Sequence, residues 1–134
     1  IERSRLRDSM RIDHQIAEAM SAGGTVAMNP EGTTSDGRGV LPFHANMLQA
    51  ALAASAPLQP VALRYADANG APSAAVEYVG DTTLGQSLWR IACAEGLCVR
   101  LQWLAPHAGA DGGDRQALAL RLRADIAAAL DAGC

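Results

Sequence analysis

A short apolar segment that runs directly into a polar, glycine-containing loop constrains the fold of this chain more than any other feature. Thr25–Met28 is followed at once by Asn29–Gly37, which carries two threonines, a serine and two carboxylates. Gly32 and Gly37 allow positive φ and a close approach of the backbone to a ligand. Because ligands of open α/β sheets bind just beyond the carboxyl ends of strands, this order predicts a buried strand that ends in a ligand-facing loop.

Helical and strand-like periodicities alternate along the chain, which favours a layered α/β fold. Apolar residues at helical spacing predict helices over about 9–22, 43–52, 84–95 and 118–130. Strands are expected at Leu58–Tyr65, Ala74–Val79 and Leu97–Leu104, and the turn residues 67–70 indicate a hairpin between the first two. We therefore expect a sheet of about four to five mixed strands flanked by helices.

The composition fits one domain whose interior is built from small and aliphatic side chains. Hydrophobic residues make up 49% of the 134 residues and aromatic residues only 4%, so Trp89 and Trp103 are expected as anchors of the core. All eleven basic residues are arginine, which excludes a phosphate-loop lysine or a Schiff-base lysine from this segment. The formal net charge of −3 argues against a nucleic-acid partner.

The three cysteines, Cys93, Cys98 and Cys134, lack the spacing of a metal site, so no metal is expected. Their odd number fits a reducing compartment, and Cys93 lies in an apolar helical pattern that predicts a buried thiol. The sequence also has no apolar run of 18 or more residues, so this segment is not expected to span a membrane.

Three short motifs give the chain a family resemblance. Asn29-Pro30-Glu31-Gly32-Thr33 resembles the third conserved block of the glycerolipid acyltransferases of the 1-acyl-glycerol-3-phosphate type, whose usual form is Phe-Pro-Glu-Gly-Thr. Ile1-Glu2-Arg3 is similar to the second block, and Leu58–Tyr65 looks like the fourth, a strand entered through a proline. The resemblance implies that 1–134 is the C-terminal portion of an acyltransferase domain.

The catalytic HxxxxD pair of that family has no counterpart in this chain. His14, His44 and His107 are followed five positions later by alanine, glutamine and glycine. His107 and Asp111 miss the spacing by one residue, and their glycine-rich surroundings predict a solvated histidine on a surface loop. No catalytic residue is therefore assigned, and the chain alone is predicted to be inactive.

The resemblance implies an enzyme that moves a fatty acyl group from an acyl-CoA or acyl carrier protein thioester to the hydroxyl of a lysophospholipid, with no other cofactor. Arg3 would hold the phosphate or carboxylate of the acceptor, because guanidinium binds planar anions through two parallel hydrogen bonds. Glu31 would bind a glycerol hydroxyl or hold Arg3, in a cleft that both side chains share. Gly32, Thr33 and Thr34 would add backbone amides and hydroxyls.

Two positions depart from the family pattern, and each assignment has a simpler alternative. Asn29 replaces the usual phenylalanine, and Thr34 stands where many members carry arginine. Arg38 would then supply the missing cation, or the acceptor would have another headgroup, as in similar loops of lyso-ornithine lipid acyltransferases. The alternatives are that Glu31 and Gly32 are turn residues and that Pro60 serves strand entry, with an acyl-pocket role for Pro60 as the minor option.

The expected partners are a lysolipid acceptor, a thioester donor and, through the intact protein, the membrane surface. The resemblance places that protein on the cytoplasmic side of the inner membrane, peripheral or anchored by segments outside this chain. An exposed sheet edge leaves pairing with a second copy open. The alternative function is a non-catalytic anion- or lipid-binding α/β module, whereas a hydrolase is disfavoured because no GxSxG motif is present.

Overall fold

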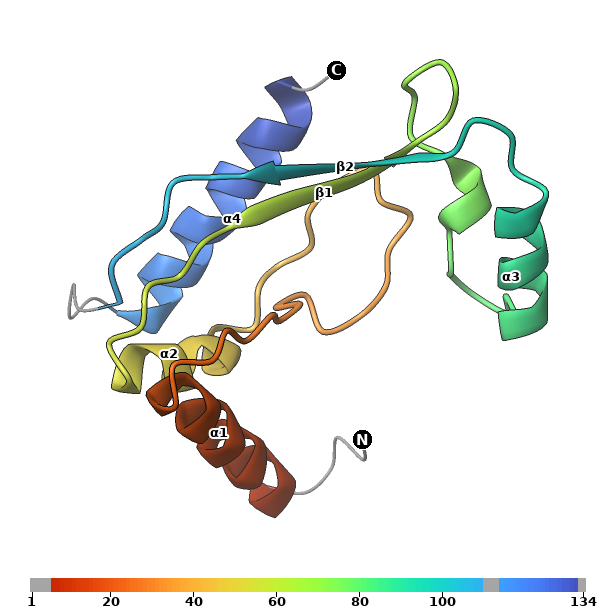
Figure 1. Cartoon of the computed structure of the whole chain (residues 1–134). Helices are drawn as coiled ribbons and strands as arrows, with labels where there is room; N and C mark the ends of the chain where they lie inside the picture. The colour runs from red at the N-terminus through yellow and green to blue at the C-terminus, as the bar shows by residue number, and fades with distance from the viewer. Residues whose placement is uncertain (1–5, 110–113, 133–134) are drawn as a thin grey trace.

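The computed structural model of the chain describes residues 6–109 and 114–132, and the side chains of the first helix from residue 14. Helices gather at one end of a two-stranded sheet, and a single helix lies at the other end (Figure 1). The elements are α1 Leu6–Ser21, η1 Ala45–Leu48, α2 Gln49–Ala53, β1 Val61–Ala66, η2 Ala74–Val76, α3 Leu84–Ala92, β2 Cys98–Trp103 and α4 Arg115–Ala132. Helices α1, α2 and α4 form the group, and α3 with η2 lies apart from it.

The helix predictions are confirmed where the sequence carries explicit end signals. Helix α1 ends where Gly23 adopts a φ of +80° and its amide donates to the carbonyl of Met20. Helix α3 begins with a reciprocal capping box between Thr83 and Gln86, in which each side chain accepts a hydrogen bond from the other residue's amide. These local signals fixed the helix ends to within a few residues.

The prediction of four to five strands is wrong for the part of the chain that the structure describes, which is mixed α/β but has a two-stranded antiparallel sheet. Strand β1 pairs with β2, so that Val61 faces Trp103 and Leu63 faces Leu101. The expected strand 25–28 has no paired neighbour among the described residues, and Val26 and Met28 are only half-buried. An extended backbone becomes a strand only when another segment supplies its hydrogen bonds.

The hairpin expected between 58–65 and 74–79 is also wrong. The turn itself forms, because the Asp67 carboxylate accepts the amides of Asn69 and Ala71. Pairing is limited to one bridge between Ala66 and Pro72, in which the amide of Ser73 donates to the carbonyl of Tyr65. The chain then turns into η2 instead of a second strand.

The core lies between α4 and the η1–α2 segment. Its most buried side chains are Leu48, Leu118, Ala119 and Leu122, and Met28 and Phe43 pack against them. Strand β1 joins this core through Ala62 and Ala66, which are buried on the sheet face toward α4. On the same face, the Arg64 guanidinium donates to the carbonyl of Leu130 on α4.

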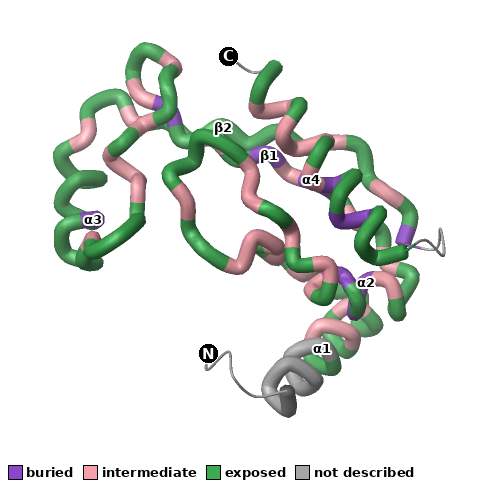
Figure 2. The backbone as a smooth tube through the Cα atoms, turned by 180° about the vertical axis from the view of Figure 1, so that it is seen from behind, coloured by how far each residue is buried: buried purple, intermediate pink, exposed green. Residues whose placement is uncertain are grey.

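The other face of the sheet is apolar and exposed, and we call it the open sheet face. Because directly paired residues share a face, the register brings together the side chains of Leu63, Tyr65, Val99, Leu101 and Trp103. Figure 2 shows the contrast: buried residues cluster on α2, α4 and β1, whereas β2 and most of α3 are exposed.

Three expectations about burial are therefore wrong. Trp89 and Trp103 are 72% and 67% exposed instead of lying in the core, and the thiol of Cys93 is exposed as well. Trp89 lies on α3 and Trp103 at the end of β2, two elements outside the buried cluster. Within the described ranges, none of the helices has the length and apolar character needed to cross a bilayer.

Candidate functional site

The predicted ligand loop is the long segment between α1 and η1, drawn in orange in Figure 1. Its two ends are clasped together, because the amide of His44 donates to the carbonyl of Pro30 over 2.8 Å. A tight turn follows Asn29, whose carbonyl accepts the amide of Gly32 at 3.2 Å. We refer to residues 29–44 as the clasped loop.

The carboxylate of Glu31 points back into this loop. Its Oε1 accepts the amide of Leu41 at 3.3 Å, and both residues are half-buried. This hydrogen bond thus connects two parts of the loop that are ten residues apart in the sequence. The predicted partner Arg3 lies outside the described residues, so the shared Arg3–Glu31 cleft stays a prediction.

Gly32 is required by both its backbone angle and its surroundings. Its φ of +67° lies in the left-handed region that side chains disfavour, and an added Cβ would come within 3.0 Å of Cδ2 of His44. The imidazole of His44, which is exposed as a residue, thus lies directly against the glycine. The contact with Gly32 gives His44 a steric role in the shape of the loop.

The two threonines that follow differ in what they can offer to a ligand. Thr33 is exposed, whereas the Thr34 hydroxyl donates to the carbonyl of Tyr78 at 2.8 Å. That bond ties the clasped loop to the segment after η2, which lies on the α3 side of the molecule. The hydroxyl proton of Thr34 is therefore engaged within the protein, and only the lone pairs of its oxygen are left to accept a hydrogen bond from a ligand.

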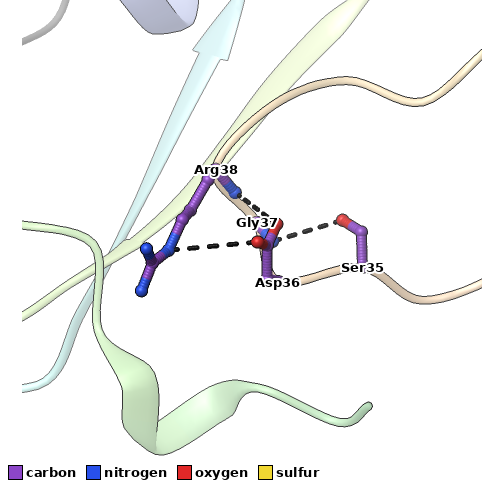
Figure 3. A network of polar contacts seen from close by, with 4 residues as sticks. All are labelled: Ser35, Asp36, Gly37 and Arg38. Atoms are coloured by element: carbon purple, nitrogen blue, oxygen red, sulfur yellow. Dashed lines mark hydrogen bonds and ion pairs between the residues drawn. The ribbon is translucent and has the colours of Figure 1, made fainter. Parts of the chain in front are cut away.

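The tip of the clasped loop is a local polar network (Figure 3). Asp36 accepts the amide of Arg38 at 3.1 Å, and its other oxygen lies 3.9 Å from Nε of the same arginine. The Ser35 hydroxyl accepts the amide of Gly37 at 3.2 Å. The Arg38 side chain is 75% exposed, so it offers a cation at the tip that Asp36 partly neutralises.

A residue of α4 that was not predicted as part of the site, Arg123, makes three hydrogen bonds to the loop. The Arg123 guanidinium donates from Nε to the carbonyls of Val40 at 3.0 Å and Leu41 at 3.1 Å, and from Nη2 to Val40 at 2.7 Å. Arg123 is half-buried and directly follows Leu122 of the apolar stripe. That adjacency was the one visible sign that this arginine differs from a solvated one.

Pro60 is buried at the entrance to β1, where its carbonyl accepts the amide of Leu104 at 3.0 Å. The expected role in strand entry is confirmed, and a role in an acyl pocket stays a prediction.

His107 differs from the expected solvated residue, because its Nε2 lies 2.7 Å from Oδ2 of Asp125 on α4 and its side chain is only 26% exposed. Asp111 lies outside the described residues.

No group of three or more histidine, cysteine or acidic side chains in the described ranges is arranged to hold a metal ion. The polar groups that gather at the clasped loop are hydroxyls, backbone amides, the carboxylates of Glu31 and Asp36 and the exposed guanidinium of Arg38. Groups of this kind are suited to bind a polar or anionic ligand.

Comparison with known proteins gives the loop a context. A family model described as Acyltransferase matches residues 1–64. The chain is 36% identical over 128 residues to a 1-acyl-sn-glycerol-3-phosphate acyltransferase of Neisseria meningitidis, a match covering 96% of this chain and 50% of the relative. It is 34% identical over 123 residues to a lyso-ornithine lipid O-acyltransferase of Pseudomonas aeruginosa, covering 92% of this chain and 47% of the relative.

The chain thus spans about half the length of these curated relatives. Solved structures give no significant match. The family model includes the clasped loop and ends within β1, whereas the match to the Neisseria meningitidis relative covers 96% of this chain. Together these matches show that residues 1–64 resemble the acyltransferase family and that the chain is similar to acyltransferases over more than 90% of its length.

Proposed function

We propose that the full-length protein transfers a fatty acyl group from an acyl-CoA or acyl carrier protein thioester to the hydroxyl of a lysolipid. In this proposal the clasped loop, residues 29–44, binds the acceptor headgroup. The names of the two relatives support a lysolipid acceptor, since one acts on 1-acyl-sn-glycerol-3-phosphate and the other on a lyso-ornithine lipid. The site of action would be the cytoplasmic face of the inner membrane.

The observation that carries the acceptor role is the fixed shape of this loop. Glu31 and the His44–Pro30 bond close it from within, which leaves Thr33 and Arg38 exposed on a constrained backbone. A loop held this way loses little conformational entropy when it binds, so it can hold a hydroxyl against a thioester carbonyl. Arg38 would meet a phosphate in a 1-acyl-glycerol-3-phosphate acceptor.

The geometry shifts the role that we assign to Glu31. Its Oε1 is engaged by the amide of Leu41, so the carboxylate acts first as a brace of the loop. Its Oε2 remains able to accept a glycerol hydroxyl in the same arrangement. Removal of the charge should therefore weaken acceptor binding both through the loop shape and through that lost contact.

The test is a thioester-release assay on the full-length protein, with acyl-CoA or acyl carrier protein donors and with either lysophosphatidate or lyso-ornithine lipid. We expect Glu31→Gln to raise the KM for the acceptor about tenfold or more, the equivalent of one charged hydrogen bond, and to leave the KM for the donor unchanged. Glu18→Gln, on the exposed face of α1, is the matched control.

An equal rise in both KM values would contradict the acceptor role of the loop. If the wild-type protein binds lysolipid but releases no thiol from either donor, the alternative of a non-catalytic lipid-binding module replaces the enzyme. The fragment 1–134 is expected to show no turnover in the same assay.

A further inference from the structure

We propose that Arg123 on α4 is a positioning residue that sets the shape of the clasped loop for the acceptor, an inference that rests on the proposed function. Arg123 is 83 residues beyond Val40 along the chain, yet its guanidinium donates three hydrogen bonds to two consecutive loop carbonyls. In the described part of the chain, no other side chain of α4 makes a comparable set of hydrogen bonds to residues 29–44.

The contact converges with Glu31 on a single residue. The amide of Leu41 donates to the Glu31 carboxylate at 3.3 Å, and the carbonyl of Leu41 accepts from Nε of Arg123 at 3.1 Å. The two polar groups of one backbone residue are thus gripped by side chains of opposite charge. A displacement of Arg123 would move Leu41, and with it the brace that orients Glu31 and the Pro-Glu-Gly-Thr turn.

The base of Arg123 is itself rigid. Leu118 and Leu122, on the same helix, are 3% and 5% exposed and belong to the buried core cluster. Helix α4 therefore has a fixed position against η1, and the half-buried guanidinium is held at the loop by packing on one side and hydrogen bonds on the other. Bonds of a charged donor are also stronger than neutral ones.

The geometry calls for arginine and not merely for a positive charge. Nε and Nη2 donate together to Val40, and Nε is shared with Leu41, an arrangement that uses the planar fork of the guanidinium. Lysine would place a single, strongly hydrated ammonium at the end of a flexible stem. Arg123→Lys should therefore recover part of the effect, and Arg123→Gln little of it.

The experiment uses the full-length protein with Arg123→Gln, Arg123→Lys and the control Arg121→Gln, which alters an exposed arginine on the same helix. Steady-state kinetics with lysophosphatidate should show about a tenfold rise in acceptor KM for Arg123→Gln, a smaller rise for Arg123→Lys and none for Arg121→Gln. The KM for the acyl donor should stay constant in all three.

Hydrogen exchange of the Leu41 amide is the second readout, and it does not depend on turnover. We expect faster exchange in Arg123→Gln and in Glu31→Gln, with wild-type exchange in Arg121→Gln, because the first two variants release the same residue. Wild-type exchange at Leu41 in Arg123→Gln, or a donor KM that rises with the acceptor KM, would overturn the inference. If the Leu41 amide exchanges faster in Arg123→Gln but the wild-type protein shows no acyl transfer, the proposed function is refuted and the inference about Arg123 stands.

Discussion

The clasped loop and the open sheet face are opposites in how their side chains are used. In the loop, the carboxylate of Glu31, the hydroxyl of Thr34 and the guanidinium of Arg123 from α4 are paired with backbone groups, and Phe43 packs against the core. On the open sheet face, five large apolar side chains are exposed, from Leu63 on β1 to Trp103 on β2. The clasped loop thus pairs these polar groups by hydrogen bonds, whereas the open sheet face leaves its apolar side chains exposed.

Helix α3 repeats this contrast within nine residues. Its one buried residue is Ser87, while Leu84, Leu88 and Trp89 are exposed. An amphipathic helix normally buries its apolar stripe, whereas α3 contacts η2 and leaves these three side chains exposed. The comparison teaches that stability in the described residues comes from the α4 side of the sheet, where the clasped loop is anchored.

The largest expected effect comes from the core beneath the clasped loop. Leu122→Ala should lower the free energy of unfolding by about 2 to 5 kcal/mol, because it leaves a cavity between α4 and η1 that the helix cannot close. Leu120→Ala, a 66% exposed leucine on the same helix, is the control and should cost less than about 1 kcal/mol. Urea unfolding measures both, and equal losses would break the comparison between the two sides of the molecule.

A smaller effect should separate strain from steric crowding inside the clasped loop. Gly37→Ala should cost about 1 to 2 kcal/mol, since its φ of +71° is left-handed but an added Cβ meets nothing within 4 Å. Gly32→Ala should cost more, because it adds the clash with His44 to a similar strain. Gly39→Ala, with neither, is the control.

The double variant Gly32→Ala/His44→Ala sharpens that measurement by removing the ring from the clash. It should bring the loss in thermal stability back to the level of Gly37→Ala. If Gly32→Ala and Gly39→Ala have the same Tm, the glycine is not required by the conformation of the loop.

Features encoded over a few residues could be predicted from the sequence. The end of α1 at Gly23, the cap of α3 at Thr83 and the turn at Asp67 all depend on groups within four positions of one another. The motif around Glu31 predicts a polar loop after residues 25–28, and the structure has a loop there between α1 and η1.

Features that depend on distant partners could not be predicted. The extended segment 25–28 has the composition of a strand, but pairing is decided by another segment, and none of the described residues supplies it. The role of Arg123 needs the position of α4 against Val40, which its place after Leu122 in the apolar stripe does not specify. The burial of Trp89 and Trp103 could not be predicted, because a large aromatic ring is buried only where other segments of the chain pack around it.

The smallest expected effect tests the open sheet face directly. Trp103→Ala should change the free energy of unfolding by less than about 1 kcal/mol, because its side chain is 67% exposed and the register leaves it opposite Val61 at the edge of the sheet. Gln102→Ala, an exposed neighbour on the other face, provides the reference. Urea unfolding of the full-length protein is the measurement. A loss of unfolding free energy as large as that of Leu122→Ala would mean that the ring of Trp103 is buried in the full-length protein. The contrast between a packed loop and an uncovered sheet face would then hold only for residues 6–109 and 114–132 taken by themselves.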